Sequence, residues 1–550
     1  MYAMNKSPTL LSDDQVRRFI ADGFIVLDSC LPDTLHAGIA RELHFSLKKE
    51  SKWLGDNLLP RVPKIEVVLQ SSVVQGAMQS LLGPDFAWAP HRFPHNSEPL
   101  DPSERPESFD PFENQPAMGK GSISGSGWHQ DGHSKAGRSR WHTFKAINLF
   151  YFPHDVPIEM GPTRLLAGTH LYATLRNALP SQVFLEPIKA GTVIVADFDL
   201  GHAGTPNRSS TSRYMLKFVA LRTSNPARPA WDHRDEQWGT PSDLRTATDV
   251  PRTWETLWHW LRGDTQSVQH DTLPTSEIPR LLTELASADN KVRLSAMYEL
   301  VRIGKPSVEP LVQQLLATKG QDRHESPAQD DPGFYAMSPD TSQRRFSRRQ
   351  FVPEDVAIAL GLIGTPSIDP LVALLDEADP WMRINAAYAL GEIGKATSAE
   401  LADQVGTLLD DELHQVVRAA ADALCWLPYG EKTIGRIKRI LVDSRDDWQD
   451  SAMGEPKLGG SWTIENQVRY ALAWTVLSRV NHPTGADVSI QLEDAMLSAL
   501  PFESGYTPAV LCQGLERIGT PQALRAVIRY LQPRRWDAFS FEPPDEREAA

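Results

Sequence analysis

The chain has few cysteines and no long apolar run. Its three cysteines, Cys30, Cys425 and Cys512, lie far apart among 550 residues. This spacing predicts neither a disulfide framework nor a thiolate metal site, so we expect a reducing, cytoplasmic environment. No stretch approaches the ~20 apolar residues of a membrane span, and the start MYAMNKSPTLLSDD lacks the apolar run of a signal peptide. We therefore expect no membrane association.

Basic residues are fewer than acidic ones. The chain has 56 Lys and Arg against 70 Asp and Glu, a formal charge of −14. Nucleic acids and anionic membranes bind a basic face, so we expect neither as a partner. The length exceeds the ~250–300 residues that one hydrophobic core serves, which predicts at least two domains.

The C-terminal half repeats itself from about residue 276. The segment DNKVRLSAMYELVRIGKPSVEPLVQQLL at 289–316 resembles DPWMRINAAYALGEIGK at 379–395. Apolar residues recur every three or four positions in both, as on one face of a helix. A Gly-x-Pro between such stripes, as in IGTP at 363–366, ends one helix and starts the next. The pattern predicts stacked helix pairs, interrupted by polar insertions at 318–350 and 443–463.

These units resemble HEAT repeats. The resemblance covers about 276–532, with Asp at the turn and Arg early in the second helix, as in DPWMR. It implies an all-α solenoid over 276–550, since such units bury their apolar faces only against one another. It also implies a possible protein partner on the solenoid.

The first 222 residues have a different period. After one helical segment, SDDQVRRFIADG with Ser12 as its N-cap, come the short apolar runs GFIVLD, FKAINLFYF, GTVIVADF and RYMLKFVAL. These runs are rich in Val, Ile, Phe and Tyr and are separated by Gly, Pro and Asp. They predict a β-domain with some helices.

A tryptophan-rich segment, 223–275, connects the two halves and holds five of the fifteen tryptophans. Its TWETLWHWL places an apolar stripe on one helical face, made of Trp254, Leu257, Trp258 and Leu261. We expect this helix to pack the β-domain onto the solenoid. Because their periods differ, we expect each half to assemble a core of its own, with 1–265 retaining ligand binding.

Residues 128–131 read WHQD. In a strand His129 and Asp131 point to the same side and Gln130 to the other, so one metal ion can receive a nitrogen and an oxygen. His202, after the apolar strand GTVIVADF, is the predicted third ligand. Two histidines and one carboxylate on one face are typical of non-haem Fe(II) oxygenases. Zinc is the competing interpretation, although structural zinc sites are closed and usually rich in cysteine. We interpret His133, His142 and His170 as structural.

Arg213 begins the strand RYMLKFVAL, eleven residues after His202, and a guanidinium grips a carboxylate through two parallel hydrogen bonds. The combination WHQD…GP…GTH…KAG…GHAGTPN…R, with the opening LSDDQVRRFIADGFIVL, resembles the phytanoyl-CoA dioxygenase family over about 11–222. The resemblance implies a double-stranded β-helix barrel of the jelly-roll or cupin type over 1–222, with flanking helices.

The resemblance also implies the site and its cofactors. Fe(II) would be held by His129, Asp131 and His202, and 2-oxoglutarate by Arg213 with Asn148 and Thr205. Two positions depart from the family pattern: the usual Pro-Gly-Ser-His reads AGTH at 167–170, and the small hydroxyl residue after the last ligand is displaced by one, to Thr205.

The activity so implied is that of an Fe(II)/2-oxoglutarate dioxygenase. It would consume O2 and 2-oxoglutarate, hydroxylate a small molecule, and release succinate and CO2. Two alternatives stay open. One is a catalytically degenerate barrel that acts as a scaffold through the repeats, and the other is a zinc or manganese hydrolase, which would need neither 2-oxoglutarate nor Arg213.

Overall fold

The structure is a computed structural model. It describes residues 7–49, 58–105, 110–112, 127–131, 140–173, 175–264, 273–321, 351–394, 398–449, 463–482, 485–503 and 505–533. The two insertions predicted in the solenoid lie largely outside the described residues.

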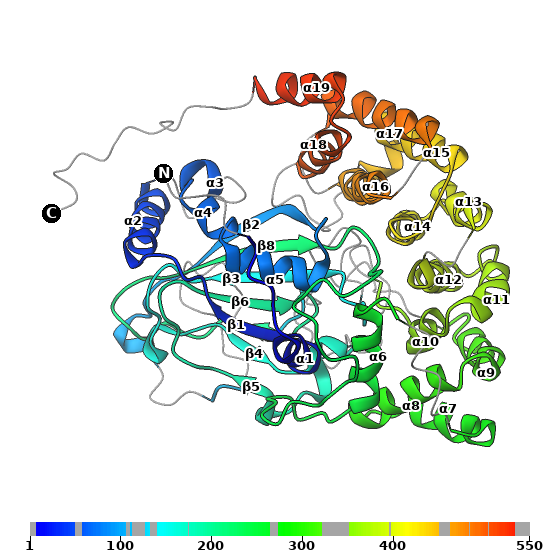
Figure 1. Cartoon of the computed structure of the whole chain (residues 1–550), viewed down its shortest axis with the longest axis horizontal. Helices are drawn as coiled ribbons and strands as arrows, with labels where there is room; N and C mark the ends of the chain where they lie inside the picture. The colour runs from blue at the N-terminus through cyan, green and yellow to red at the C-terminus, as the bar shows by residue number, and fades with distance from the viewer. Residues whose placement is uncertain are drawn as a thin grey trace.

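Two antiparallel sheets form the N-terminal half (Figure 1). The larger has the strand order β1 (Phe24–Asp28), β6 (Thr192–Asp197), β3 (Ala146–Tyr151), β8 (Arg213–Leu221) and β2 (Ala87–Ser97). The smaller has the order β5 (Val183–Phe184), β4 (Arg164–Leu166) and β7 (His202–Ala203). The four predicted apolar runs form β1, β3, β6 and β8.

The space between the sheets is an apolar core. Phe150 and Ile194 of the larger sheet pack there with Leu165 and Phe184 of the smaller one. Phe150 and Ile194 are also cross-strand partners, so their side chains leave the larger sheet on the same face. The predicted jelly-roll barrel is confirmed.

Helices cover the other face of the larger sheet. They are α1 (Asp13–Asp22), α2 (Asp33–Lys49), α3 (Leu58–Arg61), α4 (Ile65–Leu69) and α5 (Ser72–Leu82). Ser12 caps α1 as predicted, with its hydroxyl accepting from the backbone N–H of Gln15 and the Gln15 side chain bonded back to Ser12. Leu149, Val195 and Leu216 lie in the cluster that includes these helices.

The C-terminal half is a curved stack of helices in two rows (Figure 1). The inner row, toward the sheets, holds α8 (Asn290–Ile303), α10 (Asp355–Ile363), α12 (Pro380–Ile393), α14 (His414–Leu424), α16 (Ile464–Val480) and α18 (Thr507–Ile518). The outer row holds α7 (Ile278–Leu285), α9 (Lys305–Leu316), α11 (Ile368–Ala373), α13 (Ala399–Thr407), α15 (Glu431–Val442), α17 (Ala486–Ala499) and α19 (Pro521–Leu531). Gly364 ends α10 at φ 85°, which supports the predicted role of Gly-x-Pro. The predicted solenoid is confirmed, and none of its described helices, or of the rest of the described chain, could cross a membrane.

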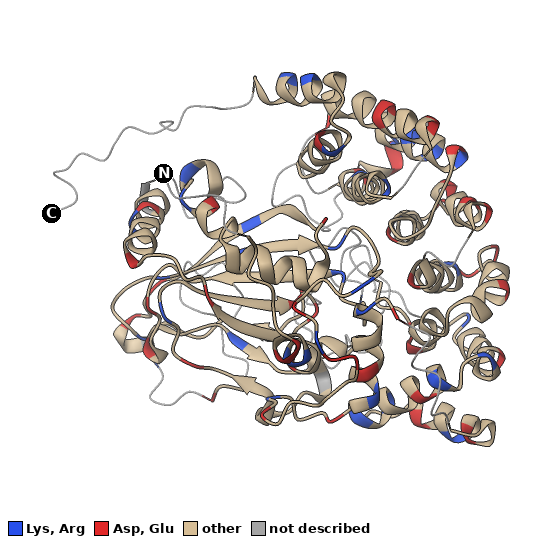
Figure 2. Cartoon of the chain, in the orientation of Figure 1, with Lys and Arg blue, Asp and Glu red and all other residues tan. Residues whose placement is uncertain are grey.

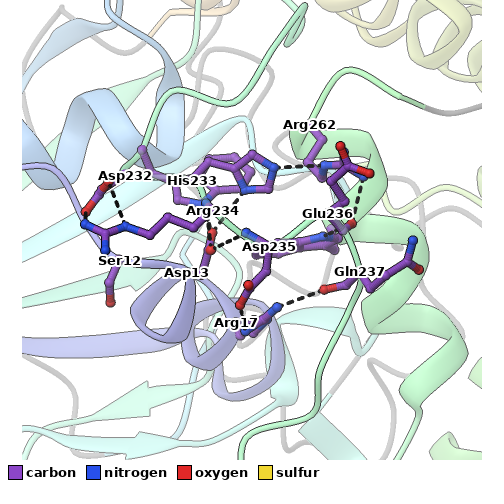
Figure 3. Close-up of polar contacts among 12 residues, drawn as sticks. Ser12, Asp13, Arg17, Asp232, His233, Arg234, Asp235, Glu236, Gln237 and Arg262 are labelled. Carbon is purple, nitrogen blue, oxygen red and sulfur yellow. Dashed lines mark hydrogen bonds and ion pairs between the residues drawn. The ribbon is translucent and has the colours of Figure 1, made fainter.

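Hydrogen bonds hold the tryptophan-rich segment against the start of α1 (Figure 3). Asp13 accepts hydrogen bonds from the Trp231 indole at 2.6 Å and from the backbone N–H groups of Arg234 and Asp235 at 2.9 and 2.8 Å. These bonds hold the pKa of Asp13 below its usual value, although burial alone would raise it. The segment is therefore fixed to the β-domain at a charged, multiply bonded carboxylate.

The predicted helix of this segment is α6 (Pro251–Leu261), and it contacts both α1 and α8. Its predicted stripe, Trp254, Leu257, Trp258 and Leu261, is at most 2% exposed. The Trp258 ring packs against Trp231 and under the Arg17 guanidinium of α1. The helix lies between the two halves, as expected.

The two halves also meet far beyond α6. Just before β3, the Trp141 indole donates to Asp422 of α14 over 3.2 Å, and His142 Nδ1 lies 3.0 Å from the hydroxyl of Tyr298 in α8. At the far end, Arg517 of α18 donates to the carbonyl of Phe86 over 3.0 Å. The concave side of the solenoid is thus lined by the β-domain, and charges of both signs are interspersed over its helices (Figure 2).

The apolar cores of the two halves are partly joined, contrary to the expectation that each half has a core of its own. The barrel interior has a core of its own, but the cluster on the other face of the larger sheet continues through α6 into the solenoid as far as Ala523. The outer face of the sheet is itself apolar, so it must be covered, and the inner helices take part in covering it. The two halves therefore do not have fully separate cores.

Candidate metal centre

Three predicted ligands converge at one edge of the barrel. One ligand atom each from His129, Asp131 and His202 lies within 4.8 Å of the others. His129 and His202 are antiparallel neighbours whose backbones exchange hydrogen bonds of 3.1 and 2.9 Å. This pairing places residues 73 positions apart side by side, and it carries Asp131 to the same face two residues later.

Each histidine is oriented by its own backbone. Nδ1 of His129 lies 3.0 Å from the carbonyl of Gly127, and Nδ1 of His202 lies 2.9 Å from that of Leu200. The ring N–H on Nδ1 therefore donates to a carbonyl, and Nε2 carries the lone pair that a metal binds. Burial lowers the pKa of His129 to about 3, and burial also lowers that of His202. Both rings are neutral at neutral pH, the form that ligates metals.

Asp131 is held by two donors from the larger sheet. Asn148 donates its Nδ2 to Oδ2 over 2.7 Å, and the Lys217 ammonium forms an ion pair with the same oxygen. Burial alone would raise the pKa of Asp131, but the charge of Lys217 and the two histidines hold it well below its usual value. The carboxylate is thus ionised and oriented. The expectation that Asn148 contacts a cosubstrate stays a prediction.

Arg213 is fully buried at the start of β8, with 1% exposure. Its Nη1 donates to the carbonyl of Gly161 over 2.5 Å, and its buried Nε has no hydrogen-bond partner in the part of the chain that the structure describes. Gly161 has φ 78°, and a Cβ there would lie 2.5 Å from the carbonyl oxygen of Thr205, so the turn that positions Arg213 requires glycine. Within the described residues no carboxylate pairs with this guanidinium.

Gln130 points away from the metal ligands, as predicted, and anchors the segment that carries them. Its Nε2 donates to the carbonyls of Thr169, Tyr172 and Asp199, and its Oε1 accepts from Arg140 over 2.8 Å. Arg140 also pairs with the Asp199 carboxylate at 2.5 Å. This network fixes the backbone between His129 and Asp131.

Sequence reasoning missed two residues of the site, Lys217 and His95. Lys217 lies four residues after Arg213 on the same strand, so the strand period alone places it on the same face. His95 lies opposite Met215 in the register of β2 and β8. The run AWAPHRFPHNS contains two prolines and was not recognised as a strand, which hid His95.

The donor set fits Fe(II) and 2-oxoglutarate. Two imidazoles and one carboxylate suit a non-haem Fe(II) ion and leave coordination positions for other ligands. Four further buried polar atoms of the β-domain have no hydrogen-bond partner among the described residues, namely Arg213 Nε, Asn148 Oδ1, Thr205 Oγ1 and His95 Nε2. A buried guanidinium without an acid partner is costly, and a dicarboxylate cosubstrate would supply the missing charge.

Comparisons with known proteins agree with this assignment. Residues 64–215 match the family model of phytanoyl-CoA dioxygenase (PhyH). Residues 351–447 match that of HEAT repeats. The site and barrel thus define a domain of the non-haem oxygenase class. More particularly, this chain carries a phytanoyl-CoA dioxygenase-type domain followed by a HEAT-repeat solenoid.

The β-domain is also similar to solved structures at low sequence identity. The α-ketoglutarate-dependent carbocyclase SnoK from nogalamycin biosynthesis is 18% identical, with a TM-score of 0.30 over 40% of this chain and 88% of that one. EctD from S. alaskensis, with 2-oxoglutarate and 5-hydroxyectoine, is 16% identical, with a TM-score of 0.30 over 44% and 88%. HygX from Streptomyces hygroscopicus, with nickel and 2-oxoglutarate, is 13% identical, with a TM-score of 0.29 over 42% and 95%. No curated protein matches the chain.

Proposed function

We propose that the protein is an Fe(II)- and 2-oxoglutarate-dependent dioxygenase that hydroxylates a small molecule and releases succinate and CO2. We assign the oxygenase to residues 1–222, the connecting segment to 223–275 and the solenoid to 276–550. The observation that carries the proposal is the convergence of His129, Asp131 and His202 in a barrel that also buries Arg213, for which the described residues offer no acid partner.

In this proposal each residue has a separate task. His129, His202 and Asp131 hold the iron, and the Arg213 guanidinium grips the distal carboxylate of 2-oxoglutarate through parallel N–H donors. Asn148 keeps the Asp131 carboxylate in one orientation. When bound, iron and 2-oxoglutarate together supply the activation of O2, coupled to loss of CO2 from the cosubstrate.

The barrel interior supports the same task. Phe150 lies beside His202, with ring centroids 5.5 Å apart, and Met215 lies in the same apolar core. Such walls exclude water from a reactive site and leave positioning to a few polar groups. The buried carbonyl of Gly161 fixes Arg213 before any ligand arrives, so little ordering remains to be done on binding.

The test is binding and turnover of the purified full chain. We expect about one Fe(II) per chain, 2-oxoglutarate binding to the metal-loaded protein by calorimetry, and slow succinate release without added substrate. Asp131→Ala is the matched variant and should lose succinate release. A metal-loaded chain that binds no 2-oxoglutarate would contradict the proposal and favour the hydrolase or scaffold alternatives.

A further inference from the structure

Lys217 brings an additional buried cation into the barrel. Its side chain is 5% exposed and that of Asp131 is 3% exposed. Within the described residues Asp131 is the one hydrogen-bond and ion-pair partner of the ammonium. An ammonium has three N–H donors, so this one keeps donors to spare inside a low-dielectric site.

Lys217 and Arg213 share the inner face of β8, with Met215 between them. His95 lies opposite Met215 on β2, and none of the described residues forms a hydrogen bond with its buried Nε2. The charges of Lys217 and Arg213 add to burial in lowering the pKa of His95, as expected of a ring beside both cations. A row of three nitrogen-bearing side chains therefore lines the barrel beside the metal ligands.

The charges of this row do not balance with the proposed cofactors alone. Arg213 and Lys217 each carry one positive charge and a divalent ion carries two, whereas Asp131 carries one negative charge and 2-oxoglutarate two. One positive charge remains. Among the described residues no carboxylate other than Asp131 pairs with either cation. An uncompensated charge in a buried site is unfavourable, so a further anion is needed.

We infer that the primary substrate carries a carboxylate that Lys217 and His95 receive once a divalent ion has bound Asp131. In the metal-free protein Lys217 neutralises Asp131. With the metal bound, the carboxylate shares its charge with the ion, and the ammonium turns its spare donors to the substrate. This inference rests on the proposed function, and it names the substrate class of the same site.

The test compares charged and neutral probes on the full chain loaded with Ni(II) and 2-oxoglutarate. The probes are straight-chain carboxylates of about four to ten carbons and the matching primary amides. Calorimetry and ligand-observed NMR measure binding without turnover. We expect the carboxylates to bind roughly tenfold to a hundredfold more tightly than the amides, the range of one charged hydrogen bond.

Lys217→Met keeps the length and apolar stem of the side chain and removes the charge. We expect this variant to lose the preference for carboxylate and to bind Ni(II) at least as tightly as wild type, because the ion no longer competes with an ammonium. Lys189→Met is the control, since Lys189 is 83% exposed and forms an exposed ion pair with Asp155. That control should keep the wild-type preference.

The outcomes separate this inference from the function on which it rests. A wild-type chain that binds neither Ni(II) nor 2-oxoglutarate contradicts the proposed function. A chain that binds both, but binds carboxylates no better than amides or binds no carboxylate, overturns the inference without any variant. Lys217→Met that loses 2-oxoglutarate but keeps the probe preference also overturns it, since the ammonium would then serve the cosubstrate.

Discussion

Lys145, one residue before β3, and Glu392 of α12 form an ion pair in which the side chains are 3% and 4% exposed. Thr143 donates to the other Glu392 oxygen over 2.7 Å, and the Lys145 ammonium lies 4.2 Å from the centre of the Trp426 ring in the solenoid. The β-domain thus places a buried cation on the solenoid, and the solenoid supplies its counter-charge. Lys145 directly precedes β3, whose Asn148 donates to Asp131, so the solenoid contacts the chain at the start of a strand that orients a predicted metal ligand.

Glu392→Gln should destabilise the full chain. Removing one partner of a buried pair leaves the other charge uncompensated, which costs about 3–5 kcal/mol. Chemical denaturation measures the change. The control is Asp494→Asn, which removes a pair whose side chains are 40% and 58% exposed and should cost about 1 kcal/mol or less. Equal effects of the two variants would show that the Lys145–Glu392 pair is not a strong link.

A chain ended after residue 264 tests the same interface more severely. It lacks Glu392, Asp422 and Tyr298, so Lys145, Trp141 and His142 lose their partners. We expect this fragment to be poorly soluble or to unfold at lower temperature than the full chain, contrary to the expectation from periodicity alone. Thermal unfolding followed by circular dichroism decides, and a fragment as stable as the full chain would mean that the contacts contribute little.

Arg213→Gln should weaken 2-oxoglutarate binding and spare the metal. Truncating a buried charge partner costs roughly 2–5 kcal/mol, about thirtyfold to several thousandfold in affinity. Calorimetry on the Ni(II)-loaded variant gives the cosubstrate affinity, and titration of the metal-free variant gives the metal affinity. Arg245→Gln, at an exposed pair with Glu186, should leave both unchanged. Unaltered cosubstrate affinity in Arg213→Gln would move the carboxylate site elsewhere.

The free energy of unfolding should decrease as the pH is lowered below about 6.5. Burial lowers the pKa of His142 to about 4 and those of His129 and His170 to about 3, whereas in the unfolded chain these histidines take up protons near pH 6.5. Between these values the three histidines bind more protons in the unfolded state, so their contribution to the free energy of unfolding decreases as pH falls. Asp197 and Asp22, whose pKa values are raised by burial, act in the opposite direction but are fewer. Folding lowers the pKa of Asp131, so its carboxylate stabilises the folded state at pH values above about 3.9, the pKa of an unfolded Asp. This contribution is lost only at lower pH, so it does not oppose the trend.

Denaturation at several pH values between 7 and 4 measures that slope. Metal affinity at pH 7 and 5 provides an internal comparison, because neutral histidines in the folded protein leave few protons to compete with the ion. We expect the affinity to change much less than the stability. A steep loss of metal between pH 7 and 5 would mean that His129 or His202 is protonated there.

Trp258→Ala should be among the more damaging substitutions. The ring is fully buried between α1 and the connecting segment, and removing a buried aromatic side chain costs about 3–5 kcal/mol. Phe502→Ala is the control, since Phe502 is 76% exposed. Limited proteolysis of the wild-type chain should spare 251–261, and rapid cutting there would show that α6 is not docked.

Local patterns determined the elements and most of the candidate site. Alternation predicted β1, β3, β6 and β8, the helical period predicted α6 and the solenoid, and the two-residue step joined His129 to Asp131. Each of these rests on neighbours within a few residues. The apolar period within 289–316 includes Val292 of α8, yet this residue is 37% exposed, because a period identifies a helix face but not the neighbour that covers each position.

Tertiary structure alone decided which charges meet. Lys217 lies 86 positions from Asp131, and Lys145 lies 247 positions from Glu392. No local sequence pattern identifies either pair. The strand period gives the face on which a lysine lies, but not whether that face meets water, a carboxylate or a partner domain. The strand register brings Lys217 to Asp131, and the curvature of the solenoid brings Glu392 to Lys145. The sequence supplies the residue types. Burial is what makes each of these charges need an opposite charge beside it, and burial exists only in the folded chain.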